Sequence, residues 1–315
     1  MRRRAGWQIV LGIALAASLW ASNDPLEVPP AVEQVFEQVH QGRYEEALAA
    51  LEDFEPDFPE TPLPALIAAE AYWGLIYCET GSITGEHVWY VAEQKTSRWD
   101  ARFFAAVETA LEASQGMREM PATAARGAFY AGLARGVRAR LYALRGQTLK
   151  SASDGKQLRA DLREAVEENS ELAADAYLGL GAYNYYADAL SPLLKVIRFF
   201  LGIPGGNREE GLEQLRIASE QARLVAVEAK FELARIYGIR EPRPAESLRL
   251  FRELSERYPE NALYALSAAY QAERAGNRNR AAAYAQEALE GAQAMEGDCR
   301  ERIGKAAREA LARLR

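Results

Sequence analysis

The sequence predicts an all-α protein built as a row of antiparallel helical hairpins, and three observations support this. Alanine, leucine, glutamate and arginine, which favour helices, dominate the 315-residue chain. The 13 prolines fall mostly between segments with helical apolar spacing, and runs of β-branched residues are nearly absent. Ser247 and Ala281 are small residues at equivalent places in two successive hairpins, and their separation of 34 residues is the period of a helix-turn-helix repeat.

Residues 1–21 have the composition of an export signal. Three arginines at positions 2–4 precede an apolar run over residues 7–20. This run suits the apolar core of a secretory signal and is shorter than the roughly 20 residues that span a bilayer as a helix. We expect cleavage after Ala21, with an uncleaved N-terminal anchor as the alternative. Residues 22–30 are polar and proline-rich and are expected to form a linker.

An exported chain of this kind is expected in the periplasm or elsewhere in a bacterial cell envelope. The formal net charge of −7 disfavours nucleic acid as a partner, because phosphate backbones would be repelled. Cys78 and Cys299 are 221 residues apart. In a row of hairpins this separation places them several repeats from each other, beyond the ~7 Å Cα limit for a disulfide. We therefore expect two buried free thiols.

Residues 31–60 are predicted to form the first hairpin. Gly42 supplies the turn, Tyr44 and Ala47 follow it, and Pro59 ends the unit. This arrangement resembles the tetratricopeptide repeat, which has a glycine at the turn, small residues where helices cross, and a proline near the end of the second helix. The resemblance implies hairpins stacked in a superhelix, with a protein partner on the concave face.

Residues 61–170 are predicted to be degenerate repeats of the same kind. Apolar spacing predicts helices within 62–79, 98–115 and 123–147, and a hairpin over roughly 128–169. The glycines between Gly127 and Gly136 would each cost about 1 kcal/mol relative to alanine in a helix. We expect the close approach of a neighbouring helix to compensate for them.

Residues 171–291 are predicted to hold the clearer repeats. The last one begins its second helix after the turn at Gly276 and has small residues at 281, 285 and 288, as close helix packing requires. Asn207 is expected to cap a helix, with Glu210 three residues on. Residues 297–314 are predicted to form a helix that caps the last hairpin.

An apolar helical insertion at residues 189–205 is expected to split one of these hairpins. Ser191-Pro192 begins a short helix and Gly202 ends it. Its apolar side chains are a candidate binding element and comprise Leu193, Leu194, Ile197, Phe199, Phe200 and Leu201. Such a helix must be covered. Either it fills the inside of its own superhelix, or it serves as a dock for a partner or as a foot on a membrane surface.

The residues around this insertion carry a second resemblance, which covers roughly 175–290. Asn184-Tyr185-Tyr186 is followed by Leu190–Val196, by Phe200-Leu201-Gly202 and by Gly206–Glu209. This series is similar to the signature of a eukaryotic tetratricopeptide family associated with mitochondrial outer membranes and inclusion-body clearance. The resemblance implies an adaptor or scaffold and brings no catalytic residues with it.

The candidate partner-binding surface is the concave face, which the first helix of each hairpin lines in tetratricopeptide domains. The positions that point to this face hold Tyr185, Tyr186, Phe231, Arg235, Tyr270 and Arg274. Tyrosine and arginine are effective anchors for a protein or peptide. Ala182 stands where the asparagine of a terminal-carboxylate clamp would be, so that clamp is not expected.

Catalysis is not expected from this chain. His40 and His87 are far apart and outside any metal-ligand spacing. We expect His40 to cap a helix end and His87 to lie on the surface. The glycine-rich residues 201–206 lack the lysine and hydroxyl of a phosphate-binding loop. We predict a non-catalytic interaction scaffold without cofactor or metal. The alternative is a carrier of an apolar small molecule or lipid, held beneath residues 190–203 and serving a transporter.

Overall fold

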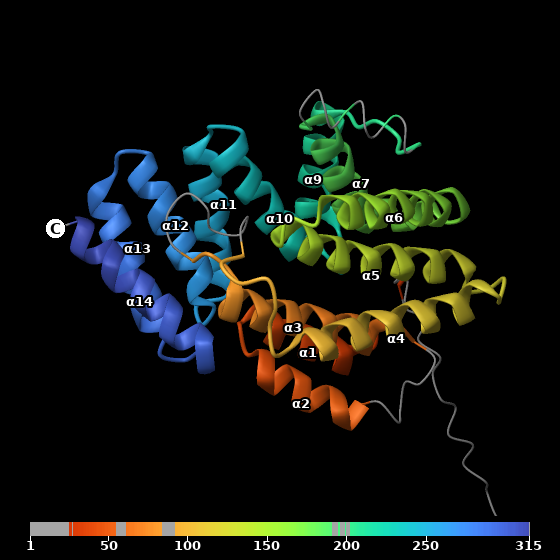
Figure 1. The fold of residues 1–315 in the computed structure, drawn as a ribbon, viewed down its shortest axis with the longest axis horizontal. Helices are drawn as coiled ribbons and strands as arrows, with labels where there is room; N and C mark the ends of the chain where they lie inside the picture. The colour runs from red at the N-terminus through yellow and green to blue at the C-terminus, as the bar shows by residue number, and fades with distance from the viewer. Residues whose placement is uncertain are drawn as a thin grey trace, which may run out of the picture.

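A computed structural model describes residues 25–26, 28–54, 61–83, 92–190, 195, 199 and 202–314. Within these residues the regular structure is helical, apart from an isolated bridge between Gly81 and Ala92. Each helix packs on the next one along the chain (Figure 1). The prediction of an all-α array of helical hairpins is confirmed.

The N-terminal third of the chain lies in the lower part of the view in Figure 1. It comprises α1 (Pro30–His40), α2 (Tyr44–Phe54), α3 (Leu63–Thr80) and α4 (Asp100–Arg118). Gly42, at φ +80°, makes the turn between α1 and α2 that its place in the sequence predicts. Helix α3 is buried around most of its circumference, which agrees with its nearly continuous apolar sequence.

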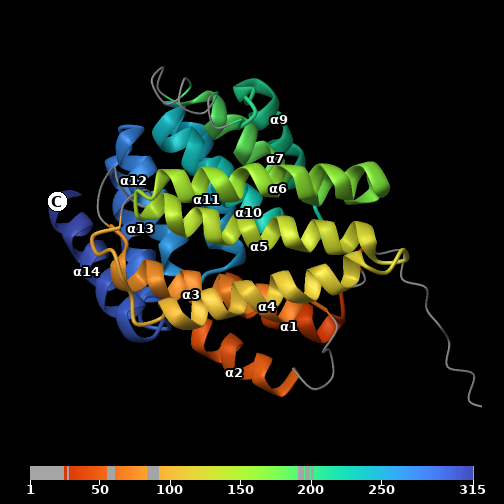
Figure 2. The same cartoon turned by 45° about the vertical axis from the view of Figure 1, so that its right-hand side comes forward.

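The middle of the chain consists of α5 (Ala124–Leu144), α6 (Thr148–Glu168) and α7 (Ala173–Asp188). The long helices α5 and α6 lie side by side (Figure 2). A methyl group added at Gly132 would come within 2.6 Å of the Leu162 side chain. The predicted close approach of a neighbouring helix to the glycines of α5 is therefore present.

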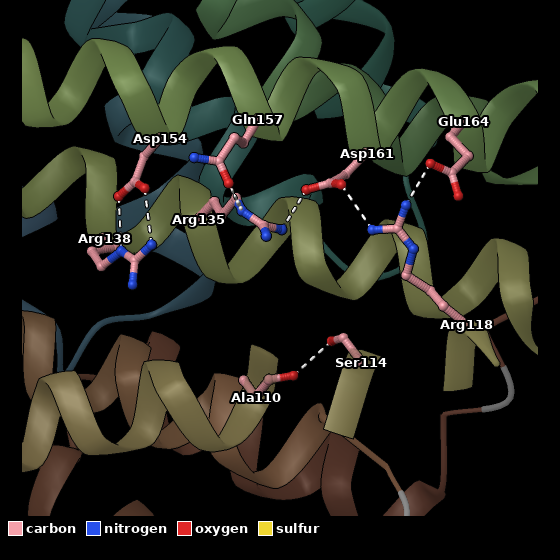
Figure 3. Close-up of polar contacts among 9 residues, drawn as sticks. All are labelled: Ala110, Ser114, Arg118, Arg135, Arg138, Asp154, Gln157, Asp161 and Glu164. Atoms are coloured by element: carbon pink, nitrogen blue, oxygen red, sulfur yellow. Dashed lines mark hydrogen bonds and ion pairs between the residues drawn. The ribbon is translucent and has the colours of Figure 1, made fainter. Parts of the chain in front are cut away.

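A row of charged side chains also joins α5 and α6 (Figure 3). Arg138 donates to both carboxylate oxygens of Asp154, at 2.8 and 2.9 Å. Asp161 accepts from Arg135 at 2.5 Å and from Arg118, at the end of α4, at 2.9 Å. Both aspartates are buried, and burial raises the pKa of Asp161 although the two arginines act against this. The row orients α6 against α4 and α5.

The C-terminal half of the chain continues the array of packed helices. Its elements are α9 (Arg208–Gln221), α10 (Ala226–Arg235), the short π-helix η3 (Ile236–Arg240), α11 (Pro244–Arg257), α12 (Ala262–Arg274), α13 (Arg278–Gly291) and α14 (Gly297–Leu314). The Asn207 side chain accepts from the backbone N–H groups of Glu209 and Glu210, so the predicted cap of α9 is confirmed. Gly276, at φ +77°, makes the turn before α13.

The array closes on itself. Helix α14 packs against α3, and both views in Figures 1 and 2 show the two helices next to each other. Cys78 on α3 and Cys299 on α14 form a disulfide with a Cα–Cα distance of 4.8 Å. The expectation of two free thiols is wrong. It treated separation along a row of repeats as separation in space, whereas the superhelix turns until its last helix meets its third.

Ion pairs and hydrogen bonds also join the N-terminal helices to segments near the C-terminus. Arg302 of α14 donates to the carbonyl oxygens of Cys78 and Gly81 at 2.6 and 2.7 Å. Arg43, at the α1–α2 turn, makes a bidentate pair with Glu260 at 2.5 and 2.7 Å. The N-terminal hairpin and α3 are thus attached to the repeats at the far end of the sequence.

Several predictions concern residues outside the described part of the chain. These include the export signal, Pro59, His87 and, within the insertion, Leu193, Leu194, Ile197, Phe200 and Leu201. Of that candidate element, Phe199 is described, and its side chain is 78% exposed. No helix among the described residues is both long and apolar enough to cross a membrane.

Candidate functional site

Two adjacent tyrosines of the predicted concave face lie on α7. Tyr185 is buried, and its hydroxyl donates to Glu241 at 2.7 Å. Arg208 donates to the same carboxylate through Nε at 2.6 Å. These hydrogen bonds, above all that from Arg208, hold the pKa of Glu241 below its usual range. Tyr185 therefore helps to hold the start of α9 against Glu241, the residue that follows η3.

Tyr186 is partly exposed and belongs to a second set of contacts with α10. Its hydroxyl donates to Glu232 at 2.6 Å, and Arg235 donates to the same side chain at 2.9 Å. The Arg235 guanidinium lies 5.8 Å from the centre of the Phe231 ring. The structure thus brings Tyr185, Tyr186, Phe231 and Arg235 to one pair of neighbouring helices, which we call the α7–α10 network.

Tyr270 and Arg274 lie on α12, apart from that network. Tyr270 is buried, and its hydroxyl donates to the carbonyl oxygen of Ile83 at 3.2 Å. The backbone that leaves α3 therefore covers this part of α12. Arg274 is exposed. Of the six residues predicted to meet a partner, Tyr186 and Arg274 keep exposed surface and the other four are buried within the chain. Their role in binding stays a prediction.

No motif in the sequence pointed to the charged cluster that lies where the two halves of the chain meet. It comprises His40 on α1, Glu70 on α3, Arg140 on α5 and Glu228 on α10, and we call it the central cluster. His40 Nε2 lies 2.7 Å from Glu228 Oε1, and Arg140 forms an ion pair with Glu70. The Arg140 guanidinium also stacks 4.0 Å from the centre of the Trp73 ring.

Burial sets the electrostatics of the central cluster. It raises the pKa of Glu70, and the charge of Arg140 offsets part of that rise. Three tyrosines surround the ion pairs, and burial raises the pKa of Tyr44 to about 12. Burial also raises the pKa values of Tyr258 and Tyr264. Aromatic side chains therefore lie around the buried polar contacts of the cluster.

His40 was expected to cap helix carbonyls, and this is wrong. Its ring packs 4.4 Å from the ring of Phe36 and 5.3 Å from that of Tyr258, and its Nε2 reaches Glu228 on a helix 188 residues further along the chain. The signal that could have indicated the cluster is Glu70, a carboxylate inside the apolar run of α3. A charge in such a run needs a buried partner of opposite sign.

The contact between His40 and Glu228 ties the N-terminal hairpin to α10, and the ion pair between Arg140 and Glu70 joins α5 to α3. Among the described residues there is no group of three or more histidine, cysteine or acidic side chains that could hold a metal ion. What the arrangement provides is a fixed relative position of α1, α3, α5 and α10.

Comparisons with known proteins found a fold likeness of low score. No protein-family model matches the chain, and no curated protein does. Among solved structures, the C-terminal part of a TPR repeat-containing protein from Cytophaga hutchinsonii is 13% identical in sequence. The match covers 90% of this chain and 95% of that one, with a TM-score of 0.34. The resemblance of residues 175–290 to the mitochondrial tetratricopeptide family finds no support in these comparisons.

Proposed function

We propose that this chain is a non-catalytic protein-interaction scaffold of the bacterial cell envelope. The observation that carries the proposal is closure: two ends of a helical-hairpin array are joined by a disulfide and by ion pairs between distant segments. A surface fixed in this way loses little conformational entropy when a partner binds. Hairpin arrays of this kind offer extended surfaces rather than enclosed reaction sites.

The disulfide supports the envelope part of the proposal. Disulfides persist in exported proteins and are rare in the reducing cytosol of mesophiles. Cys78 and Cys299 are both buried, as expected of a structural bond. Together with the arginine-led apolar segment at residues 2–20, the bond favours export. Cell fractionation with thiol alkylation should recover the oxidised chain from the envelope, whereas reduced chain in the cytosol would contradict this part.

The binding surface we propose centres on Tyr186. Its partly exposed ring is held by the hydrogen bond to Glu232 and lies 5.8 Å from the Arg240 guanidinium, which is exposed. An oriented tyrosine next to an arginine is the composition of a binding hot spot. Arg274, which is exposed on α12, is the second residue that we propose to contact the partner. The proposed partner is a protein or a peptide segment.

A photo-cross-linking amino acid at position 186 tests this surface in the cells that make the protein. We expect a discrete cross-linked protein product, and Arg240→Ala should weaken it. The matched control carries the same amino acid at Glu256, which is 68% exposed on α11. Equal products from both positions, or no product from position 186, would remove the Tyr186 surface from consideration.

A further inference from the structure

The cations of this chain are unevenly divided between lysine and arginine. The sequence has 32 arginines and six lysines, and four of the lysines, Lys95, Lys150, Lys156 and Lys195, gather around α6 and its neighbours. Many arginines are engaged in ion pairs inside the fold, as in the row between α5 and α6. The lysines are placed differently, because three of the four are exposed and have no carboxylate partner among the described residues.

These lysines lie on α6 or near the turn, the helix and the insertion that adjoin it. Lys95 donates to the carbonyl oxygen of Arg145, at the turn that leads into α6. Lys150 lies in the first turn of α6, and Lys156 follows on the same helix. A methyl group added at Gly202 would lie 3.8 Å from Lys156 Nζ, so the end of the insertion rests beside α6. Lys195 pairs with Asp188 at 3.3 Å.

The outward face of the first half of α6 presents no exposed acid. The one acid between residues 146 and 160 is Asp154, which is buried and held by Arg138. Asp161 is likewise buried and accepts hydrogen bonds from Arg135 and Arg118. On a chain with a net charge of −7, this face is locally cationic because the row of ion pairs neutralises its carboxylates inside.

Large apolar side chains stand among the lysines. Leu149 is 66% exposed and Phe199 is 78% exposed. Lys156 is seven residues after Leu149, so the two lie on the same side of α6 about 10 Å apart along its axis. Phe199 is three residues before Gly202, which rests beside Lys156. We call this group of side chains the α6 patch. It comprises Leu149, Lys150, Lys156 and Phe199, with Lys95 at the edge.

We propose that the α6 patch binds the surface of an anionic lipid bilayer. Apolar side chains flanked by lysines suit the boundary between headgroups and acyl chains, where the rings and methyl groups enter and the ammonium groups stay with the phosphates. A lysine near an anionic bilayer strengthens binding roughly fivefold. This assignment goes beyond the scaffold role, since it fixes which side of the molecule faces a membrane and leaves the Tyr186 surface to a partner.

Sedimentation of the full chain with lipid vesicles tests the proposal. We expect binding to vesicles that contain phosphatidylglycerol, weaker binding to pure phosphatidylcholine vesicles, and a loss of the difference at high salt. Lys150→Glu with Lys156→Glu should lower the partition coefficient at least 20-fold, since about 1 kcal/mol per lysine is roughly fivefold. Leu149→Ser with Phe199→Ser should also weaken binding. The matched control is Lys305→Glu with Arg308→Glu, both exposed on α14.

The N-terminal apolar segment is present in every variant, so differences between variants report on the patch alone. Thermal melting monitored by circular dichroism verifies that each variant folds. Wild-type partitioning of the lysine variant, or equal binding to both kinds of vesicle, would overturn the proposal. If the lysine variant loses binding and the Leu149→Ser, Phe199→Ser variant does not, the contact is purely ionic. The apolar side chains would then not enter the bilayer, and the proposed mode of membrane contact would be wrong.

Discussion

Removing the disulfide should destabilise the fold more than any ordinary surface change. The bond closes a loop of 221 residues between α3 and α14. The chain-entropy relation for a loop of this length gives about 5 kcal/mol at 25 °C, which is at the top of the range measured for disulfides. Domains are stable by roughly 5–15 kcal/mol in total. A loss of this size is therefore a large fraction of the whole.

Urea unfolding of the Cys78→Ala, Cys299→Ala variant measures this loss directly. We expect its free energy of unfolding to fall by several kcal/mol, with a clear drop in the midpoint. The wild type in dithiothreitol should follow the variant once the bond is reduced. Because both cysteines are buried, reduction should be slow until the chain begins to unfold. Equal midpoints for the variant and the oxidised wild type would show that the bond does not stabilise the fold.

Three further predictions concern the interior. Glu228→Ala leaves the buried His40 without its hydrogen-bond partner. The free energy of unfolding should drop by about 1–3 kcal/mol, the cost of an unsatisfied buried polar group. No measurable loss would show that this contact does not form in solution. Gly74→Ala should destabilise the fold by roughly 1–3 kcal/mol, because the new methyl group would lie 2.5 Å from the Tyr44 ring. Gly116→Ala in α4 is the matched control, since no atom lies within 4 Å of its new methyl group. It should stabilise the fold by about 0.5–1 kcal/mol. The opposite order in thermal melting would contradict the packing of α2 on α3. The third prediction concerns alkaline pH. A tyrosine whose pKa is raised on folding contributes stability that is fully present below its unfolded pKa. This contribution is lost as the pH rises through the folded pKa. The pKa of Tyr44 rises from 10.0 to about 12 on folding, which corresponds to roughly 3 kcal/mol at about 1.4 kcal/mol per unit. Stability should therefore decline between pH 10 and 12. Tyr44→Phe should flatten part of that decline in urea titrations.

Local features of the fold were predictable because they depend on neighbouring residues. The turn at Gly42 needs a left-handed backbone that glycine adopts without strain. The cap at Asn207 depends on residues within three positions of it. The glycines of α5 indicated close packing before the partner, Leu162, was known. Each of these rests on interactions within one hairpin or between adjacent helices.

Closure was not predictable in the same way. Whether α14 meets α3 depends on the sum of small rotations between successive hairpins, and no local pattern encodes that sum. The disulfide and the pairing of His40 with Glu228 both follow from closure, so they were missed together. The burial of Tyr270 has the same origin, because the backbone at Ile83 reaches α12 only in a closed array. Glu70 was the residue whose surroundings carried a usable signal.

The proposed scaffold requires that the chain closes through α3 and α14. The most direct test is mass spectrometry of the native protein, alkylated before unfolding and digested without reduction. We expect a linked pair of peptides containing Cys78 and Cys299, recovered from monomeric protein. Recovery of both cysteines in alkylated form, or of links between two separate chains, would contradict it.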